Sequence, residues 1–552
     1  MVSTLHVGPF RAREVVLICK KCGCTYRSEE LCSLVPPGAN FGYDVMVYAG
    51  KALFLRYRTE EEVVAELAQQ NLRISPREVS LLGMKFIVCL ALCQQRRAGA
   101  FKEVMEARGG YICHLDATCE GGNPILMSSL DSLSEMVLGN IKLPSENEKN
   151  IVPFLQRIKK TFGIPVALVH DMGKGILKAV AVVFPGVPDF ICHFHFLRDI
   201  GKDFLAKDYD IIRKGLRSHQ IGSQLRSLAK QLIGDVDQNP ELIEAFQTAL
   251  DDHPLLPSSL EKLPVLNSYT LIQWALQGMS EGNGYGFPFD QPHLAFAKRI
   301  RQLYAHVDKL KDMQLRGKWQ DNTPYFKIHI ALKKIMRDKA LWNALEQIEQ
   351  GIIVFEKLRK AMRIASGSTG RGLNDDGQNT NIKTIECRVK SFKAWLMNRK
   401  DYSQNQDVRK VIEQIDKYWD KLFADPITVQ TPSGSIQIRP QRTNNILEQF
   451  FRHLKRAHRR RTGNKCACRL LRTMLAETPL VRNLQNEDYM KILLNGKASL
   501  EEVFAQIEID TLREEFRKAQ LNPENIPAKI KALIAIQNYP EKLINMVEKA
   551  VT

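Results

Sequence analysis

Short apolar segments alternate with helical segments between residues 111 and 193, and this alternation limits the fold of the chain more than any other feature. Three strand-like segments come first, and a helix, a strand, a second helix and a fifth strand follow them. This order predicts an α/β domain in which the first and fourth strands lie side by side in a mixed sheet. The expected strands are 111–116, 124–127, 136–143, 165–169 and 189–193, and the expected helices are 147–162 and 174–184.

Two acidic residues stand on the strands that this order places side by side. Asp116 lies in the first strand, and Asp171 directly follows the fourth strand in the segment VHDMGK. A buried parallel strand that ends on an acid delivers a carboxylate to a site at its C-terminal end. Asp171 is therefore a candidate metal ligand, although an Asp in this position can also be a turn or helix-cap residue.

The composition is that of a globular protein with an excess of basic residues. The chain has 552 residues, and a chain of this length predicts about three or four domains. Its formal net charge of +18 favours nucleic acid as a partner, although a generally basic surface would have the same charge. No apolar run of about eighteen residues and no secretory signal are evident, so we expect no membrane segment and a cytoplasmic location.

Four cysteines gather near the N-terminus of a chain whose twelve cysteines are too sparse for a disulfide scaffold. Cys19 and Cys22 form a Cys-x-x-Cys pair before a glycine, which is a turn that lets two thiolates bind one zinc ion. Cys24, Cys32 or His6 would have to complete such a site. The pattern indicates either a structural zinc ion or free thiols.

A helix-turn-helix is predicted after an apolar segment at 44–55, which reads as a strand or as another buried segment. Thr59 and Glu62 form a capping-box pattern, and Ser75 with Glu78 repeats this pattern before a second helix. A plain helical hairpin would have the same signals. The basic residues near the second helix that could contact DNA are Arg73, Arg77 and Lys85.

The region 201–426 is mostly helical in pattern and holds all five tryptophans. A small hairpin is expected at 428–439, and a basic helix follows it. Asn444 or Asn445 would cap this helix, and Glu448 lies in its first turns. The basic residues of this helix are Arg452, Lys455, Arg456, Arg459, Arg460 and Arg461.

Asp116, Asp171 and Glu448 make up the set of carboxylates that a two-metal phosphoryl-transfer site requires. Their hard oxygen ligands suit Mg²⁺ or Mn²⁺. Glu448 could instead be a solvated acid that pairs with the basic side chains of its own helix. The three residues are therefore candidate catalytic and metal-binding residues.

With these residues the chain resembles the DDE transposases with an RNase H-like core, especially the Mutator-like and related bacterial insertion-sequence transposases. The resemblance rests on the LDAT segment around Asp116, on Asp171 with a later FPG segment, and on the TNNILEQFFRHLKR segment. Cys192 and His195 match the C-x-x-H signature that this group carries after its second Asp. The long helical region matches the all-helical insertion of the family, and the whole resemblance covers roughly residues 100–475.

The resemblance implies metal-dependent cleavage at transposon ends, followed by attack of the freed 3′-hydroxyl on target DNA. Asp116, Asp171 and Glu448 would hold two Mg²⁺ or Mn²⁺ ions. The protein would assemble on DNA as a homodimer or larger oligomer, and it would be nucleoid-associated in a bacterium. By resemblance Cys192 and His195 lie beside the catalytic centre, whereas the residues alone are equally consistent with half a zinc site or with buried packing.

The expected fold class is α/β, with an RNase H-like mixed-sheet core interrupted by a large all-α insertion. Two other functions remain compatible with the sequence: a non-catalytic, transposase-derived DNA-binding regulator, and a structure-specific nuclease on the same fold. The expected parts are a Cys-cluster region at 1–55, a helix-turn-helix region at 56–108, the core at 109–200 and 427–475, the insertion at 201–426 and a helical C-terminal region at 476–552.

Overall fold

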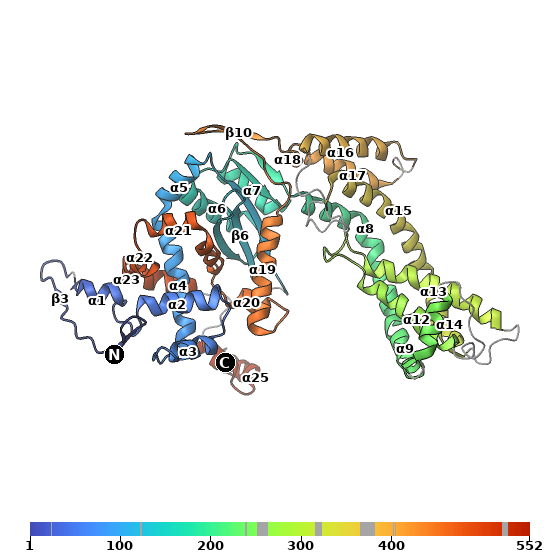
Figure 1. The fold of residues 1–552 in the computed structure, drawn as a ribbon, viewed down its shortest axis with the longest axis horizontal. Coiled ribbons are helices and arrows are strands. Elements are labelled where there is room, and N and C mark those ends of the chain that lie inside the picture. The colour runs from blue at the N-terminus through green and yellow to red at the C-terminus, as the bar shows by residue number, and fades with distance from the viewer. Residues whose placement is uncertain are drawn as a thin grey trace. The chain divides into compact units, whose positions relative to one another are not determined.

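A computed structural model gives the structure of the chain, shown in Figure 1. The chain divides into two compact units, each of which is described by itself. Unit 1 contains Met1–Asp189, Ile427–Ile438 and Ile446–Thr552, and unit 2 contains Phe190–Pro426 and Arg439–Asn445. The structure describes residues 1–551 except 24, 122–123, 238–239, 251–262, 315–322, 365–380, 401, 403–404 and 521–527.

A five-stranded mixed sheet organises the α/β part of the chain, as the strand pattern predicted. The sheet has the order β7-β6-β5-β8-β9. The first three strands in the chain form an antiparallel meander, and β8 lies parallel to β5. The boundary between the units falls within the edge strand β9. The strands are β5 (Ile112–Thr118), β6 (Ile125–Asp131), β7 (Val137–Leu143), β8 (Ala167–His170) and β9 (Asp189–Ile191).

Two amphipathic helices connect the strands and lie beside the sheet (Figure 1). Helix α6 (Glu148–Phe162) begins at Asn147, whose side chain accepts a hydrogen bond from the Asn150 amide, and it ends at Gly163 with a positive φ of 83°. Its apolar face is buried. Helix α7 (Lys174–Val183) follows β8 and packs against α6. The crossover through α6 is what allows β8 to run parallel to β5.

Helices form most of the chain between residues 29 and 107 of unit 1. The apolar segment at 44–55, expected as a strand or as another buried segment, forms the buried helix α2 (Tyr43–Phe54). It is buried on nearly all sides, so its sequence lacks the alternation that separates a helix from a strand. Gly50 lets α2 approach α4 (Pro76–Arg96) closely, because a Cβ at this position would lie 2.2 Å from Cγ of Phe86.

The predicted helix pair is present as α3 (Glu60–Ala68) and α4. Both hydrogen bonds of the capping box form: the Glu62 amide donates to the Thr59 hydroxyl over 3.2 Å, and the Thr59 amide donates to the Glu62 carboxylate over 2.8 Å. Ser75 caps α4 by accepting from the Glu78 amide. Helix α5 (Ala98–Ala107) then leads into the sheet.

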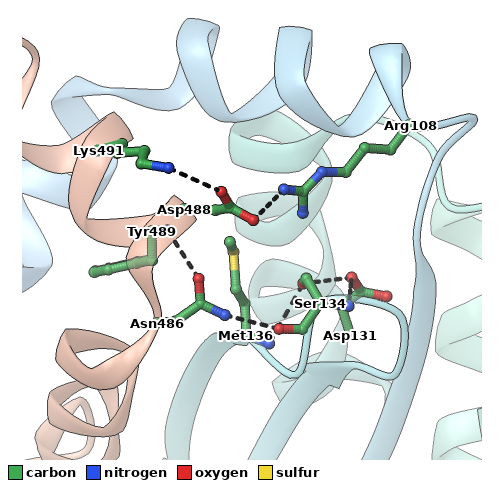
Figure 2. A network of polar contacts seen from close by, with 8 residues as sticks. All are labelled: Arg108, Asp131, Ser134, Met136, Asn486, Asp488, Tyr489 and Lys491. Atoms are coloured by element: carbon green, nitrogen blue, oxygen red, sulfur yellow. Dashed lines mark hydrogen bonds and ion pairs between the residues drawn. The ribbon is translucent and has the colours of Figure 1, made fainter.

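The C-terminal helices pack into unit 1 and complete its core. Phe504 of α22 (Leu500–Ala505) lies with its ring centroid 5.7 Å from that of Phe86 on α4. Figure 2 shows α21 (Glu487–Leu494) held to the turn between β6 and β7, where the Asn486 side chain donates to the Ser134 carbonyl over 2.8 Å. The remaining elements here are α19 (Asn445–Thr462), α20 (Cys468–Thr473), the 3-10 helix η2 (Thr478–Gln485), α23 (Ile509–Gln520), α24 (Ala528–Ile534) and α25 (Tyr539–Val551).

Unit 2 is helical, which confirms the prediction for 201–426 in the residues that the structure describes. Short antiparallel hairpins lie outside it: β1 (Val2–Thr4) with β2 (Gly8–Phe10), β3 (Leu17–Ile18) with β4 (Thr25–Tyr26), and β10 (Ile427–Thr431) with β11 (Gly434–Ile438). Among the described residues, no helix is both long enough and apolar enough to cross a membrane. The helices of unit 2 are α8 (His193–Ser218), α9 (Ile221–Asp237), α10 (Pro240–Leu250), α12 (Leu263–Gln277), η1 (Gly278–Ser280), α13 (Pro292–Gln314), α14 (Thr323–Met336), α15 (Lys339–Met362), α16 (Ile382–Met397), α17 (Gln406–Lys417) and α18 (Trp419–Leu422).

Candidate functional site

Asp116 and Asp171 meet at the centre of the sheet in unit 1. The register pairs Ile112 of β5 with Ala167 of β8, and the same offset of 55 residues places Asp171 level with Asp116. A carboxylate oxygen of one aspartate lies within 4.8 Å of a carboxylate oxygen of the other. Asp116 is buried and Asp171 is half-buried. The sheet therefore brings together two of the three predicted catalytic residues.

Backbone amides orient both carboxylates. The Ala117 amide donates to Oδ1 of Asp116 over 2.8 Å, and the Gly173 amide donates to Oδ1 of Asp171 over 2.9 Å. The contact with Gly173 is the turn interaction expected of an Asp after a strand. Asp171 is thus a turn residue and a member of the acid pair at the same time, so the two interpretations of this residue are compatible.

His170 fixes the end of β8 next to Asp171. Its buried ring lies with Nδ1 2.7 Å from the carbonyl oxygen of Asp171 and with Nε2 3.2 Å from a carboxylate oxygen of Asp189. Because β8 is adjacent to β5, fixing the Asp171 backbone also fixes the separation of the two aspartates. His170 is therefore a positioning residue that the sequence did not single out.

Glu448 lies in the first turn of α19 and is half-buried. Among the described residues, its carboxylate oxygens do not lie within 4.8 Å of the carboxylate oxygens of both Asp116 and Asp171. The helix itself is the predicted one, because it begins at Asn445 and carries the expected run of basic residues. A role for Glu448 as the third metal ligand stays a prediction.

The acid pair offers the oxygen donors that a hard divalent cation requires. Two ionised carboxylates whose oxygens lie within 4.8 Å of each other repel by at least about 3 kcal/mol at an effective dielectric constant of about 20. A cation between them offsets this repulsion. Mg²⁺ and Mn²⁺ prefer carboxylate oxygens over sulfur or imidazole ligands, so the donor set fits these ions.

Cys192 and His195 lie in unit 2, at the start of α8. Sγ of Cys192 accepts a hydrogen bond from the Asn444 amide over 3.2 Å, and the His193 amide donates to the Arg442 carbonyl over 2.9 Å. Cys192 therefore packs against the segment before α19, as expected for a buried cysteine. The ring of His195 lies in edge contact with that of Phe194, with 5.7 Å between their centroids.

The predicted DNA-binding residues are mostly exposed. On α19 the exposed ones are Arg452, Arg456, Arg459 and Arg460, whereas Lys455 and Arg461 are half-buried, and Arg461 pairs with Glu60 of α3 over 3.2 Å. Near the start of α4, Arg73 and Arg77 are exposed and Lys85 is half-buried.

A second contact joins the basic helix to the segment before α3. Tyr57 Oη lies 2.5 Å from Nε2 of His453 on α19. Burial and nearby guanidinium groups, with that of Arg482 first among them, lower the pKa of His453, so the ring is neutral at neutral pH and can accept this hydrogen bond. The helix pair and the basic helix therefore pack together within unit 1.

The described N-terminal cysteines, Cys19, Cys22 and Cys32, do not form a group of metal ligands. The Gly23 amide donates to the Cys19 carbonyl over 2.8 Å, so the turn of the Cys-x-x-Cys pair is present. Among the described cysteines, Cys19, Cys22 and Cys32 do not converge within 4.8 Å, and Cys24 lies outside the described residues. Zinc binding in this region stays a prediction.

A different group of metal-binding residue types was not predicted. Glu120, Cys466 and Cys468 each offer a ligand atom within 4.8 Å of the other two. Glu120 follows β5, whereas the two cysteines follow α19. The Cys-x-Cys spacing at 466–468 was a visible signal, but its partner lies 346 residues earlier in the chain.

No protein-family model matches the sequence, and no curated protein matches it.

Proposed function

We propose that this chain is a DNA transposase with an RNase H-like core, which cuts and joins DNA by metal-dependent phosphoryl transfer. The observation that carries the proposal is the meeting of Asp116 on β5 with Asp171, which directly follows the parallel strand β8; their carboxylate oxygens lie within 4.8 Å of each other. An acid pair at this place in a mixed sheet, combined with a basic helix in the same unit, is a combination suited to chemistry on a nucleic-acid backbone.

The chain order of the elements also supports the proposal. An antiparallel meander, a crossover to a parallel central strand and a second crossover precede a long helical region. A hairpin and the acid-bearing helix α19 follow that region. This is the arrangement that the resemblance to DDE transposases with an all-helical insertion implies.

In the proposed site Asp116 and Asp171 would hold the metal, and Glu448 would join them as the third carboxylate. Bound Mg²⁺ or Mn²⁺ would lower the pKa of a water molecule or hydroxyl and stabilise the charge that develops on the scissile phosphate. His170 and the two backbone amides keep the aspartates in place. Arg452, Arg456, Arg459 and Arg460 contact backbone phosphates, and the protein assembles on DNA as a homodimer or larger oligomer.

The test is cleavage and joining of DNA taken from the two flanks of the gene, where the ends of a mobile element would lie. With Mg²⁺ the purified chain should nick this DNA and join the ends to a target plasmid. Asp116→Asn and Asp171→Asn should each lower the rate at least about a hundredfold and leave DNA binding within about twofold. Asp510→Asn is the matched control, because this aspartate of unit 1 is 90% exposed and pairs only with Arg513 of its own helix among the contacts described.

Cleavage that survives Asp171→Asn would contradict the proposal. Cleavage without joining would instead indicate the nuclease alternative on the same acid pair.

A non-catalytic DNA-binding regulator is the second candidate, and the helix pair α3–α4 with exposed Arg73 and Arg77 favours it. Such a protein would bind the same DNA equally well with or without a chelator. It would also show no Mg²⁺-dependent nicking under any condition. The chelator comparison in the assay above therefore separates the two candidates.

A further inference from the structure

Three side chains from two distant segments of unit 1 converge at the end of β5. Sγ of Cys466 and Sγ of Cys468 lie 2.8 Å apart. The carboxylate of Glu120 accepts a hydrogen bond from the Ala467 amide over 2.9 Å. The backbone carbonyl oxygen of Glu120 lies 3.4 Å from Sγ of Cys468. Ala467 between the cysteines is buried, while Cys466 is exposed and Cys468 is half-buried. The segment thus turns one small side chain inward and holds both sulfur atoms beside Glu120.

A backbone amide lies beside the two sulfur atoms. The Cys468 amide donates a hydrogen bond to Sγ of Cys466 over 3.4 Å. Two thiolates and a carboxylate within 4.8 Å of one another would repel strongly without a cation. Two sulfur ligands and one carboxylate favour zinc over the hard cations that suit the acid pair at Asp116 and Asp171.

We propose that Cys466, Cys468 and Glu120 bind a zinc ion, with water in the fourth position. This site is separate from the acid pair and does not depend on the proposed transposase function. It joins the end of β5, the strand of Asp116, to the segment that follows α19, the helix of Glu448. The ion would therefore hold the C-terminal end of the basic helix against the sheet.

The test is a Co²⁺ titration of the full chain under reducing conditions, after bound metal has been removed. The protein carries Cys19→Ser and Cys22→Ser, which disable the N-terminal cysteine pair. One equivalent of Co²⁺ should produce the near-ultraviolet absorption of cobalt–thiolate bonds, and Zn²⁺ should abolish it by displacing the cobalt. Adding Cys466→Ser with Cys468→Ser should remove the absorption, and Glu120→Gln should weaken Co²⁺ binding at least about tenfold.

Cys387→Ser is the matched control, because Cys387 is also exposed but lies on α16 in unit 2. Circular dichroism checks that the variants keep their helix content, and the milder Cys466→Ser and Glu120→Gln variants decide the outcome if the double variant does not fold. Hydrogen exchange provides a second readout: Zn²⁺ should slow the exchange of residues 463–473 in the parent protein and not in Glu120→Gln.

The proposal fails if the parent protein shows no cobalt–thiolate absorption. It also fails if this absorption survives the loss of both cysteines, or if Cys466 and Cys468 are recovered as a disulfide from zinc-containing samples. None of these readouts depends on DNA cleavage, so the zinc site and the transposase proposal can fail independently.

Discussion

His193 illustrates at the scale of one residue how burial sets the charge of a side chain. Its Nε2 donates to the Leu422 carbonyl over 2.6 Å, and its Nδ1 is buried with no hydrogen-bond partner among the described residues. Burial, with a smaller contribution from the Arg442 guanidinium, lowers the pKa of His193 to about 3. The ring is therefore neutral in the folded protein at any ordinary pH.

This lowered pKa predicts that unit 2 loses stability in mild acid. Between pH about 6.5 and about 3 the unfolded chain binds a proton at His193 that the folded chain does not, so the free energy of unfolding falls as the pH falls. The loss is about 1.4 kcal/mol for each pH unit in this window. Urea unfolding followed by tryptophan fluorescence measures it, because all five tryptophans belong to unit 2.

The matched variant is His193→Gln, whose amide can donate to the same carbonyl but does not titrate. Between pH about 6.5 and about 3, its free energy of unfolding should fall by about 1.4 kcal/mol less per pH unit than that of the parent protein. Equal pH dependence in the two proteins would show that His193 is not buried in its neutral form.

At the scale of single elements, α19 combines a half-buried acid in its first turn with exposed arginines in later turns. Arginines that contact phosphates release counterions when the protein binds DNA, so each contact adds to the salt dependence of binding. Neighbouring guanidinium groups on one helix also repel each other in the free protein, and phosphates relieve this repulsion.

Replacing Arg452 and Arg456 by alanine should weaken DNA binding and reduce its salt dependence. The slope of the logarithm of the binding constant against the logarithm of the salt concentration should become about 1.8 less negative, since each lost phosphate contact removes about 0.9. Fluorescence anisotropy at several salt concentrations measures this slope. The control variant, Arg452→Lys with Arg456→Lys, keeps both charges and should keep the slope of the parent protein. An unchanged slope in the alanine variant would exclude Arg452 and Arg456 from the DNA contact.

Elements whose signals lie within a few residues could be predicted from the sequence. Thr59 and Glu62 are three residues apart, and the predicted capping box forms. The strand order followed from the alternation of segments, and it brought Asp116 beside Asp171. Helix α2 was uncertain because a segment buried on nearly all sides has no polar face to reveal its period.

Contacts between distant segments could not be predicted in the same way. The approach of Glu120 to Cys466 and Cys468 depends on the sheet and α19 being in place, and no local pattern marks Glu120 as their partner. Likewise, the C-terminal helices read only as amphipathic, although Phe504 and Tyr489 are fully buried in the core of unit 1. Such pairings arise from packing over hundreds of residues and leave no periodic signal in one sequence.

At the scale of the whole molecule, unit 1 is assembled from three stretches of chain. Its core joins residues of α2 and α4 to residues of the last quarter of the sequence. Unit 2 is formed from the residues between the first two of these stretches, with a short segment from 439–445. Unit 1 therefore needs both ends of the chain in order to fold, whereas unit 2 needs only residues between 190 and 445.

A chain that ends after Leu475 should keep unit 2 and lose unit 1. The truncation removes several fully buried side chains, including Tyr489 and Phe504. Truncating a single buried aromatic typically costs about 3 to 5 kcal/mol, and a whole domain is stable by only about 5 to 15 kcal/mol. Hydrogen exchange should show loss of protection in β5 and β8, while the tryptophan fluorescence of unit 2 stays native-like.

A chain that ends after Gln520 is the control, because the described residues of α24 and α25 are largely exposed. It should keep the protection of the sheet. Protected β5 and β8 amides in the shorter chain would show that the C-terminal helices are not needed for the core.

The contact between Phe86 and Phe504 can form only after the ribosome has synthesised both residues. Ribosomes add roughly 5 to 20 residues per second, so the 418 residues that separate these rings take about 20 to 80 s to synthesise. During this interval α2 and α4 can pack against each other, but the apolar surface that they bury against the C-terminal helices has no partner yet. Helices and hairpins form within microseconds, which is far shorter than the time of synthesis. The N-terminal helices therefore expose part of their apolar surface to water until the C-terminal helices have been made. We therefore expect a chaperone that binds apolar segments to hold this part of the chain until the last helices emerge.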